Sequence, residues 1–149
     1  MRAVVQRVSS ARIGVGGELV ASMGEGLLAL VGVGRDDTPA QAEDLAQRLV
    51  HLRIFNDENQ RMNRSLLDTG GTLGLVSQFT LYGDARHGRR PSFAGAAPAA
   101  QAAPLMEVLA EAALGLGVSV VSGRFQAMME VELVNSGPVT ILLDTDRQF

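Results

Sequence analysis

The stretch TLGLVSQFTL, residues 72–81, is the clearest candidate for a buried strand in this sequence. A short run rich in Leu, Val and Phe is typical of a strand in the core of a sheet. Its polar residues need an explanation. Because a strand alternates its faces, Gln78 and Thr80 are expected to share one face, opposite Ser77 and Phe79. Burying such groups without partners costs about 1–3 kcal/mol each. Either they bond to neighbouring backbone, which is the simpler interpretation, or they line a pocket.

Two amphipathic helices are predicted on either side of this strand. The first has a clear start, with Thr38 as the cap and Pro39 in the first helical position, and its apolar stripe extends over residues 39–52. The second is rich in Ala and ends at Gly115 or Gly117, because glycine favours the conformation that closes a helix. Both helices are expected to pack on a sheet.

Most of the remaining chain has the composition of short strands separated by turns. Gly16-Gly17 lies between two of them and is a hairpin signal. Residues 55–71 are polar and rich in turn formers, which predicts a short segment that leaves the main sheet. The pattern predicts one compact domain over residues 1–149, of the α/β class with α+β character, in which two main helices cover a curved, barrel-like sheet of about eight mostly hairpin-connected strands. The other expected strands cover residues 2–8, 11–15, 18–23, 27–33, 118–121, 129–134 and 139–143.

The composition excludes several kinds of chemistry. The 149 residues include no Cys and no Lys, all 13 basic residues are Arg, and the only histidines are His51 and His87. A thiolate nucleophile, a thiolate-bound zinc and a lysine Schiff base are therefore excluded, and two histidines far apart in sequence argue against a site with several His ligands. We expect no metal and no cofactor. No segment has the apolar length of a membrane span, and the charged start does not fit a secretion signal, so a cytoplasmic location is expected.

The turn formers in NSGPVT, residues 135–140, lie between two predicted strands, and the simplest interpretation is a hairpin turn. The Gly137-Pro138 bond can be cis at a small energetic cost. A cis bond would turn both flanking carbonyl groups to one side, where they could bind a ligand. The sequence therefore offers two alternatives here, a plain turn or a rigid recognition element.

The only basic cluster, RHGRR, directly follows the polar strand and contains Arg86, Arg89 and Arg90. The chain as a whole carries a net charge of −3, which argues against nucleic-acid binding through bulk positive charge. A solvated loop is the simple interpretation of the cluster. The alternative is that its forked side chains bind phosphates beside the candidate pocket.

Four motifs together resemble the D-aminoacyl-tRNA deacylase family, also called the D-tyrosyl-tRNA(Tyr) deacylase family. They are RAVVQRV at residues 2–8, SQFTL at 77–81, GRRPSF at 88–93 and NSGPVT at 135–140. The likeness extends along the whole chain. It implies a homodimer that binds the acceptor end of tRNA at the subunit interface. In that arrangement the floor of the site is formed by Ser77, Gln78, Phe79 and Thr80 of one subunit. The Gly137-Pro138 motif, with a cis bond, reaches in from the other subunit and, together with Arg7, excludes L-amino acids.

The activity that the resemblance implies is hydrolysis of the ester in D-aminoacyl-tRNA, with glycyl-tRNA(Ala) as a further candidate substrate. Such an ester is already activated, so orientation of a water molecule and an oxyanion site at the N–H groups near Phe79 and Thr80 suffice. Thr80 as a nucleophile is an alternative, although no base stands beside it in sequence. A second hypothesis is a noncatalytic RNA-binding or dimerisation module with the same fold.

Overall fold

The computed structural model describes the whole chain, residues 1–149, as a mixed α/β structure with three α-helices, eight strands and one 3-10 turn. The predicted fold class is confirmed. In chain order the elements are β1 (Arg2–Val15), β2 (Glu18–Met23), β3 (Gly26–Gly32), α1 (Pro39–His51), β4 (Phe55–Asn56), β5 (Met62–Arg64), α2 (Leu66–Thr69), β6 (Thr72–Ser77), η1 (Phe79–Tyr82), α3 (Ala99–Gly115), β7 (Ser119–Ser122) and β8 (Glu130–Asp144).

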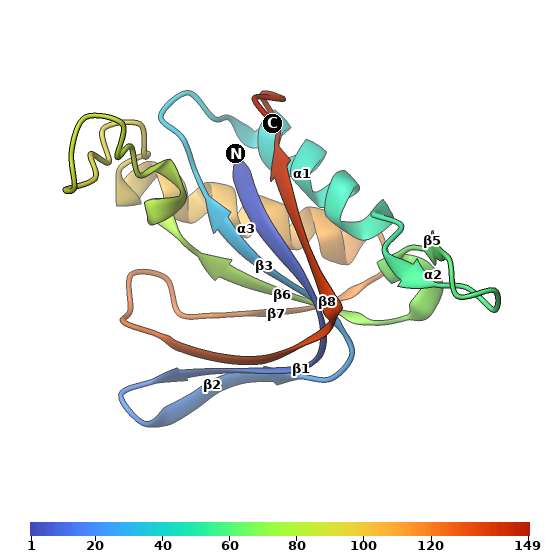
Figure 1. The fold of residues 1–149 in the computed structure, drawn as a ribbon. Helices are drawn as coiled ribbons and strands as arrows, with labels where there is room; N and C mark the ends of the chain where they lie inside the picture. Colours follow the sequence, from blue (N-terminus) through green and yellow to red (C-terminus); the bar gives the residue numbers. More distant parts are fainter.

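The long strand β1 organises the main sheet, whose order is β2-β1-β3-β6-β7 with β8 also paired to β1. The first half of β1 pairs with β3, the second half pairs with β2, and β8 follows β1 along almost its full length. The register between β1 and β8 shifts on both sides of Val8. Figure 1 shows that β1 and β8 run side by side and bend together, which gives the sheet its predicted curvature.

The connections differ from the expected series of hairpins. β3 pairs with β6 in parallel, and β6 pairs with β7 in parallel. Parallel neighbours need a crossover, which the segments containing α1 and α3 supply. Only β1–β2 and β4–β5 pair as antiparallel neighbours in sequence. The prediction of mostly hairpin connections is therefore wrong, because each of the two predicted helices lies between parallel strands.

Both predicted helices form where their local signals indicated. α1 begins after Thr38, whose backbone N–H donates to the side-chain Oε1 of Gln41 at 2.9 Å. α3 ends at Gly115 and contains Pro104. The polar segment predicted over residues 55–71 contains β4, β5 and the single-turn helix α2. No helix is long and apolar enough to cross a membrane.

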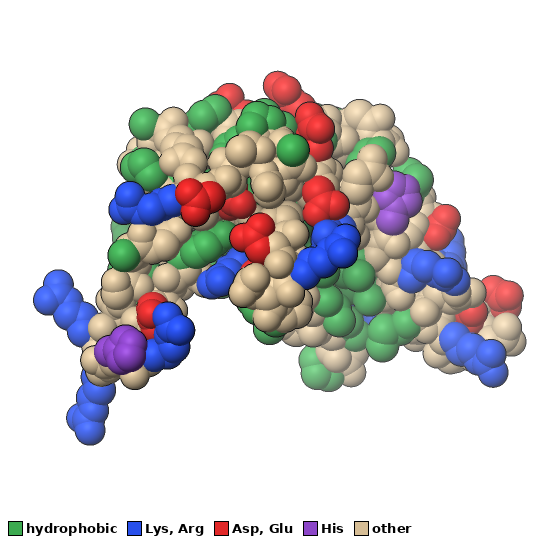
Figure 2. Space-filling model, turned by 90° about the horizontal axis from the view of Figure 1, so that it is seen from above, with side chains coloured by type: hydrophobic (Ala, Val, Ile, Leu, Met, Phe, Trp, Pro, Cys, Tyr) green, Lys and Arg blue, Asp and Glu red, His purple; other side chains and the backbone are tan.

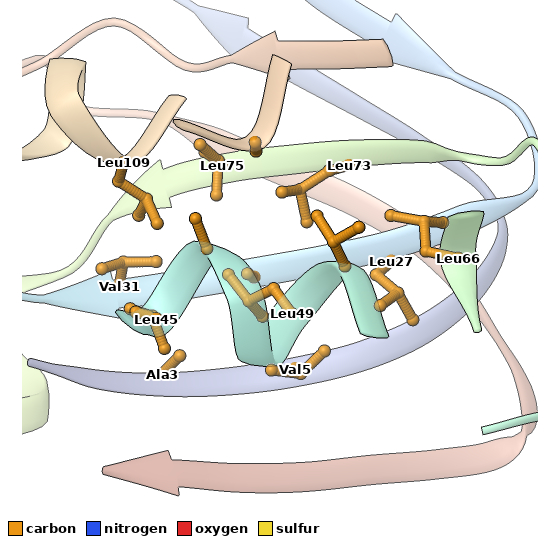
Figure 3. Close-up of a cluster of buried hydrophobic side chains, with 14 of the residues drawn as sticks. Ala3, Val5, Leu27, Val31, Leu45, Leu49, Leu66, Leu73, Leu75 and Leu109 are labelled. Carbon is orange, nitrogen blue, oxygen red and sulfur yellow. The ribbon is translucent and has the colours of Figure 1, made fainter. Parts of the chain in front are cut away.

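The two faces of the sheet bury two separate clusters. Alternate residues of β3 explain the division, since Leu27 and Val31 face the helices while Leu28 faces the layer formed by β1, β2 and β8. Figure 3 shows Leu45 and Leu49 of α1 and Leu109 of α3 pointing toward the strands. Each fully buried leucine contributes about 1.5–3 kcal/mol to folding. This packing holds the C-terminal ends of β3 and β6 beside the first part of α3. The candidate site lies there.

Candidate active site

The polar motif begins where β6 ends. β6 pairs with β3 up to the pair Val31–Ser77, and the N–H of Gln78 donates to the carbonyl of Val31 at 2.7 Å. β3 itself ends at Gly32, so the chain has no further strand partner and curls into η1. The prediction of a strand continuing to Leu81 is therefore wrong.

The curl changes how the motif presents its side chains. In and after η1, the N–H of Leu81 donates to the carbonyl of Gln78 at 3.2 Å, and the N–H of Gly83 donates to the carbonyl of Thr80 at 2.9 Å. The N–H groups of Phe79 and Thr80 precede these bonds, in the positions that a helical turn leaves without an intrahelical acceptor. The side chain of Gln78 donates from Nε2 to Oγ1 of Thr80. The polar groups thus lie at the surface, and Thr80 and Phe79 are exposed.

A cavity of about 610 Å³ opens beside the motif. Its volume lies in the range of small-molecule sites, and 13 of its 17 lining residues are hydrophobic. Five structural regions contribute: the ends of β3 and β6, η1, the first part of α3, and the segment that enters β8. The lining residues are Val31, Val33, Val76, Ser77, Gln78, Phe79, Thr80, Ala97, Ala99, Ala102, Met106, Phe125, Gln126, Ala127, Met128, Met129 and Val131.

Sequence reasoning missed the walls of this cavity. Met106 comes from α3, and Phe125–Met129 comes from the loop before β8, far from the polar motif along the chain. The run FQAMM, residues 125–129, was the available signal, because Phe and Met gather there in a segment between two strands. Met128 is 92% exposed, so this wall is only partly covered by the chain itself.

Tyr82, the last residue of η1, anchors this turn through contacts with Gly34, Asp37 and Arg2. Its ring lies against Gly34, where an added Cβ would come within 2.7 Å of the phenol oxygen. The phenol donates to Oδ2 of Asp37 at 3.4 Å, and the guanidinium of Arg2 lies 4.6 Å from the ring centroid. Burial, and then the charge of Asp37, raise the pKa of the Tyr82 phenol well above its usual range. The phenol therefore stays protonated and acts as an anchor.

Gly137-Pro138 lies in a bulge within one strand. The bond is cis, as predicted, and Gly137 has φ +136°. The predicted hairpin turn is wrong, because β1 is long enough to pair with both halves of β8, which therefore continues through the motif. The side chain of Asn135 spans the bulge: Oδ1 accepts from the N–H of Val139 at 2.8 Å, and Nδ2 donates to Oγ1 of Thr140 at 3.1 Å.

Arg7 holds this bulge against the β4 region. Its Nε donates to the carbonyl of Ser136 at 2.9 Å, and its Nη1 donates to the carbonyl of Ile54 at 2.6 Å. Arg7 and Ser136 line a second, more polar cavity of about 230 Å³. Within one chain, Arg7, Gly137 and Pro138 are absent from the lining of the larger cavity. The structure brings Arg7 and Gly137-Pro138 together, and it separates them from Ser77–Thr80 of the same chain.

The basic cluster forms an exposed loop next to η1. Asp84 and Ser92 close the loop with two backbone hydrogen bonds of 2.8 and 2.9 Å. Figure 2 shows a projecting arm that carries basic side chains and a histidine. Arg86 donates to both carboxylate oxygens of Asp84, at 2.8 and 2.7 Å, and this side-chain hydrogen bonding holds the pKa of Asp84 well below its usual range. Arg89 and Arg90 are exposed and make no ion pair.

The chain contains no group of three or more His, Asp or Glu side chains that could hold a metal ion. The groups that surround the larger cavity are two hydroxyls, the two side-chain amides of Gln78 and Gln126, backbone N–H groups and apolar side chains. Such a set can bind an apolar ligand with a polar end, orient a carbonyl group and stabilise negative charge on its oxygen.

A family model and several relatives indicate one family. Residues 4–144 match the family model described as D-Tyr-tRNA(Tyr) deacylase. A D-aminoacyl-tRNA deacylase of Roseiflexus sp. (strain RS-1) is 60% identical over 97% of this chain and 94% of its own length. The enzyme of the same name from Symbiobacterium thermophilum is 54% identical over 100% and 99%.

Two solved structures share the fold. The structure of a c-Myc DNA unwinding element binding protein superposes with a TM-score of 0.92 at 35% identity, over 97% of this chain and 98% of that one. A probable eukaryotic D-amino acid tRNA deacylase gives a TM-score of 0.81 at 17% identity, over 95% of this chain and 97% of that one.

Proposed function

The chain belongs to the D-Tyr-tRNA(Tyr) deacylase family and is a D-aminoacyl-tRNA deacylase, and on this premise we propose how its cavity carries out the reaction. The substrate is the ester between a D-amino acid and the terminal ribose of tRNA, and the products are the free D-amino acid and tRNA. The supporting observation is the apolar cavity of about 610 Å³ with Ser77, Gln78, Phe79 and Thr80 at its edge. We propose that the protein acts in the cytoplasm.

The chemistry needs few side chains. A water oxygen adds to the carbonyl carbon, the carbon–oxygen bond to the ribose breaks, and the ribose oxygen receives the proton that the water loses. We assign stabilisation of the carbonyl oxygen to the N–H groups of Phe79 and Thr80, which have no acceptor within η1. Gln78 and Ser77 orient the substrate, and the ribose hydroxyl of the tRNA assists the proton transfer.

Thr80 acts as a positioning group in this proposal. Its hydroxyl accepts a hydrogen bond from the amide of Gln78, and an amide cannot serve as a general base. We expect Thr80→Ala to lower kcat/KM on D-tyrosyl-tRNA about tenfold, whereas loss of an obligatory nucleophile removes several powers of ten. Thr80→Ser, which keeps the hydroxyl, is the matched control. An acylated Thr80 detected by mass spectrometry during turnover would show that the covalent route is correct.

The separation of Gly137-Pro138 from the cavity supports a homodimer. We propose that this bulge reaches into the cavity of a second copy. Without it, the site has no group that contacts the α-carbon of the substrate and distinguishes the D- from the L-configuration. β8 pairs on one edge only and exposes Val134 and Leu142, by 57% and 56%, which suits a contact with another chain. Sedimentation is expected to give a dimer of the 15.7 kDa chain. A fully active monomer would contradict this.

The same bulge accounts for selection of the D-form. When the amino and carbonyl groups are held, D- and L-amino acids exchange the positions of hydrogen and side chain at the α-carbon. A rigid backbone wall on one side therefore rejects every L side chain and admits every D side chain. Glycine has no side chain to reject, so glycyl-tRNA(Ala) is a proposed second substrate.

Arg89 and Arg90 are proposed to bind phosphates of the tRNA. They are free of ion pairs, whereas Arg86 is engaged by Asp84. We expect the double change Arg89→Ala and Arg90→Ala to weaken tRNA binding and to reduce the slope of log K against log salt by about 1.4–1.8. The kcat at saturating substrate should stay unchanged. The single change Arg86→Ala is expected to have a smaller effect.

Arg12→Ala is the control for this experiment, because Arg12 is exposed on β1, outside both the loop and the cavity. Binding measured across a salt series gives the result directly. If affinity and slope are the same in the double variant and the wild type, the cluster is a solvated loop.

One experiment separates an enzyme from a noncatalytic RNA-binding module. Purified protein is incubated with D-tyrosyl-tRNA and with L-tyrosyl-tRNA, and the release of tyrosine is followed. The proposed function requires release from the D-form only. Protection of both substrates, or no change in either, would support the binding module.

A further inference from the structure

Two aromatic side chains are exposed between the cavity and the basic loop. Phe79 and Phe93 contact each other edge to face, with ring centroids 5.1 Å apart and an angle of 70° between the rings. Their exposed fractions are 58% and 38%. Phenylalanine side chains normally bury most of their large apolar surface. An aromatic pair that stays this exposed is therefore a candidate contact surface.

The position of the pair decides what it can contact. Phe79 lines the cavity, and Phe93 directly follows Ser92, which closes the basic loop. Gly83 allows this approach, because an added Cβ there would lie 3.1 Å from the ring of Phe93 and 2.9 Å from the carbonyl of Thr80. The pair thus joins the cavity to the loop that carries Arg89 and Arg90.

We propose that Phe79 and Phe93 form a stacking platform for an unpaired RNA base, the one next to the terminal adenosine of the tRNA. This rests on the proposed function, in which the terminal nucleoside and its amino acid occupy the cavity. The preceding nucleotide must then leave the cavity over its rim, where Phe79 and Phe93 lie. Exposed aromatic rings beside a positively charged path are the usual arrangement for single-stranded nucleic acid, because every base has a face that stacks.

The choice of RNA over a protein partner follows from charge. The aromatic pair adjoins the densest run of basic residues along a chain whose net charge is −3. A phosphate backbone complements the charge of that cluster. The bases attached to it supply flat surfaces that can stack on the exposed rings. In a two-fold contact through this surface, a second copy would bring its own basic cluster against this one, and like charges repel.

The test compares two substrates that differ only in the upstream nucleotides. D-Tyrosyl-tRNA contains the base in question, and 3′-O-D-tyrosyladenosine lacks it. We expect Phe93→Leu to lower kcat/KM on the tRNA about tenfold through KM, because stacking on an aromatic ring is lost. The same variant should cleave the nucleoside substrate like the wild type. Phe93→Tyr, which keeps the ring, should restore activity on the tRNA.

Leu114→Ala is the matched control, because Leu114 is an exposed apolar side chain on α3 outside the cavity, and its loss should change neither activity. Equal losses on both substrates in Phe93→Leu would overturn the platform in favour of a structural role for Phe93. An unchanged tRNA activity would overturn it outright. A change of oligomeric state in Phe93→Leu would mean that the pair covers a second copy instead. Failure of the wild type on both D-substrates would instead overturn the proposed function.

Discussion

Replacing Gly137 by alanine is expected to lower kcat/KM on D-tyrosyl-tRNA about a hundredfold. Gly137 has φ +136°, a conformation that L residues rarely adopt. An added Cβ would also lie 2.8 Å from Cγ2 of Val139 and 2.9 Å from Nη2 of Arg7. Either the backbone of the bulge or the side chains of Val139 and Arg7 that pack against it must therefore shift. A displacement of about 1 Å in a positioning group can cost about two powers of ten in rate.

Gly17→Ala provides the control for backbone strain. Gly17 also has a positive φ, +83°, but it lies in the β1–β2 turn and an added Cβ there meets no atom within 4 Å. We expect this variant to lose some stability and to keep its activity. Rates on D- and L-tyrosyl-tRNA, measured alongside the melting temperature, separate the two effects. If Gly137→Ala is folded, dimeric and as active and selective as the wild type, the bulge does not form the wall of the site.

Replacing Arg7 by alanine is expected to relax the selection between D- and L-substrates. Arg7 ties the carbonyl of Ser136 to that of Ile54 through its guanidinium. Hydrogen bonds to a charged group contribute about 1.5–3 kcal/mol each. Once they are lost, the bulge can shift and an L side chain finds room. We expect kcat/KM on D-tyrosyl-tRNA to fall by about tenfold to a hundredfold and hydrolysis of L-tyrosyl-tRNA to become measurable.

Arg53→Ala is a suitable comparison for Arg7→Ala. Arg53 also donates to a backbone carbonyl, that of Asn63 at 2.8 Å, but this bond lies on the surface and involves no residue of the bulge. Its loss should leave the preference for the D-form intact. The measured quantity is the ratio of kcat/KM for the two substrates. An unchanged ratio in Arg7→Ala would remove Arg7 from chiral selection and leave it as a structural contact.

Features fixed by local chemistry were predictable from the sequence. The start of α1 follows from the capping residue Thr38 and from Pro39, which both act within one turn of the helix. The end of α3 follows from glycine in the same way. The Ser77–Thr80 motif was also recognised as a candidate site because polar groups interrupt an apolar strand, and that signal lies within ten residues.

Features fixed by distant partners were not predictable. Residues 78–81 have the composition of a strand, but they form η1 because β3 ends at Gly32 and offers no partner beyond it. Asn135–Pro138 has the composition of a hairpin turn, but it forms a bulge within β8, which continues beyond it because β1 pairs with both of its halves. The cavity walls from α3 and residues 125–129 depend in the same way on packing between segments far apart in sequence.

The distance between the cavity and the Gly137-Pro138 bulge of the same chain has a consequence for inheritance. In the proposed dimer every site contains residues from two copies of the chain, and the two copies can come from different alleles. If one allele is damaged at Gln78 and another at Gly137, a mixed dimer has one site with both defects and one with neither, so random assembly restores about a quarter of all sites. An allele that carries both changes does the opposite. It inactivates both sites of every dimer that it forms with a normal chain, and its effect is dominant.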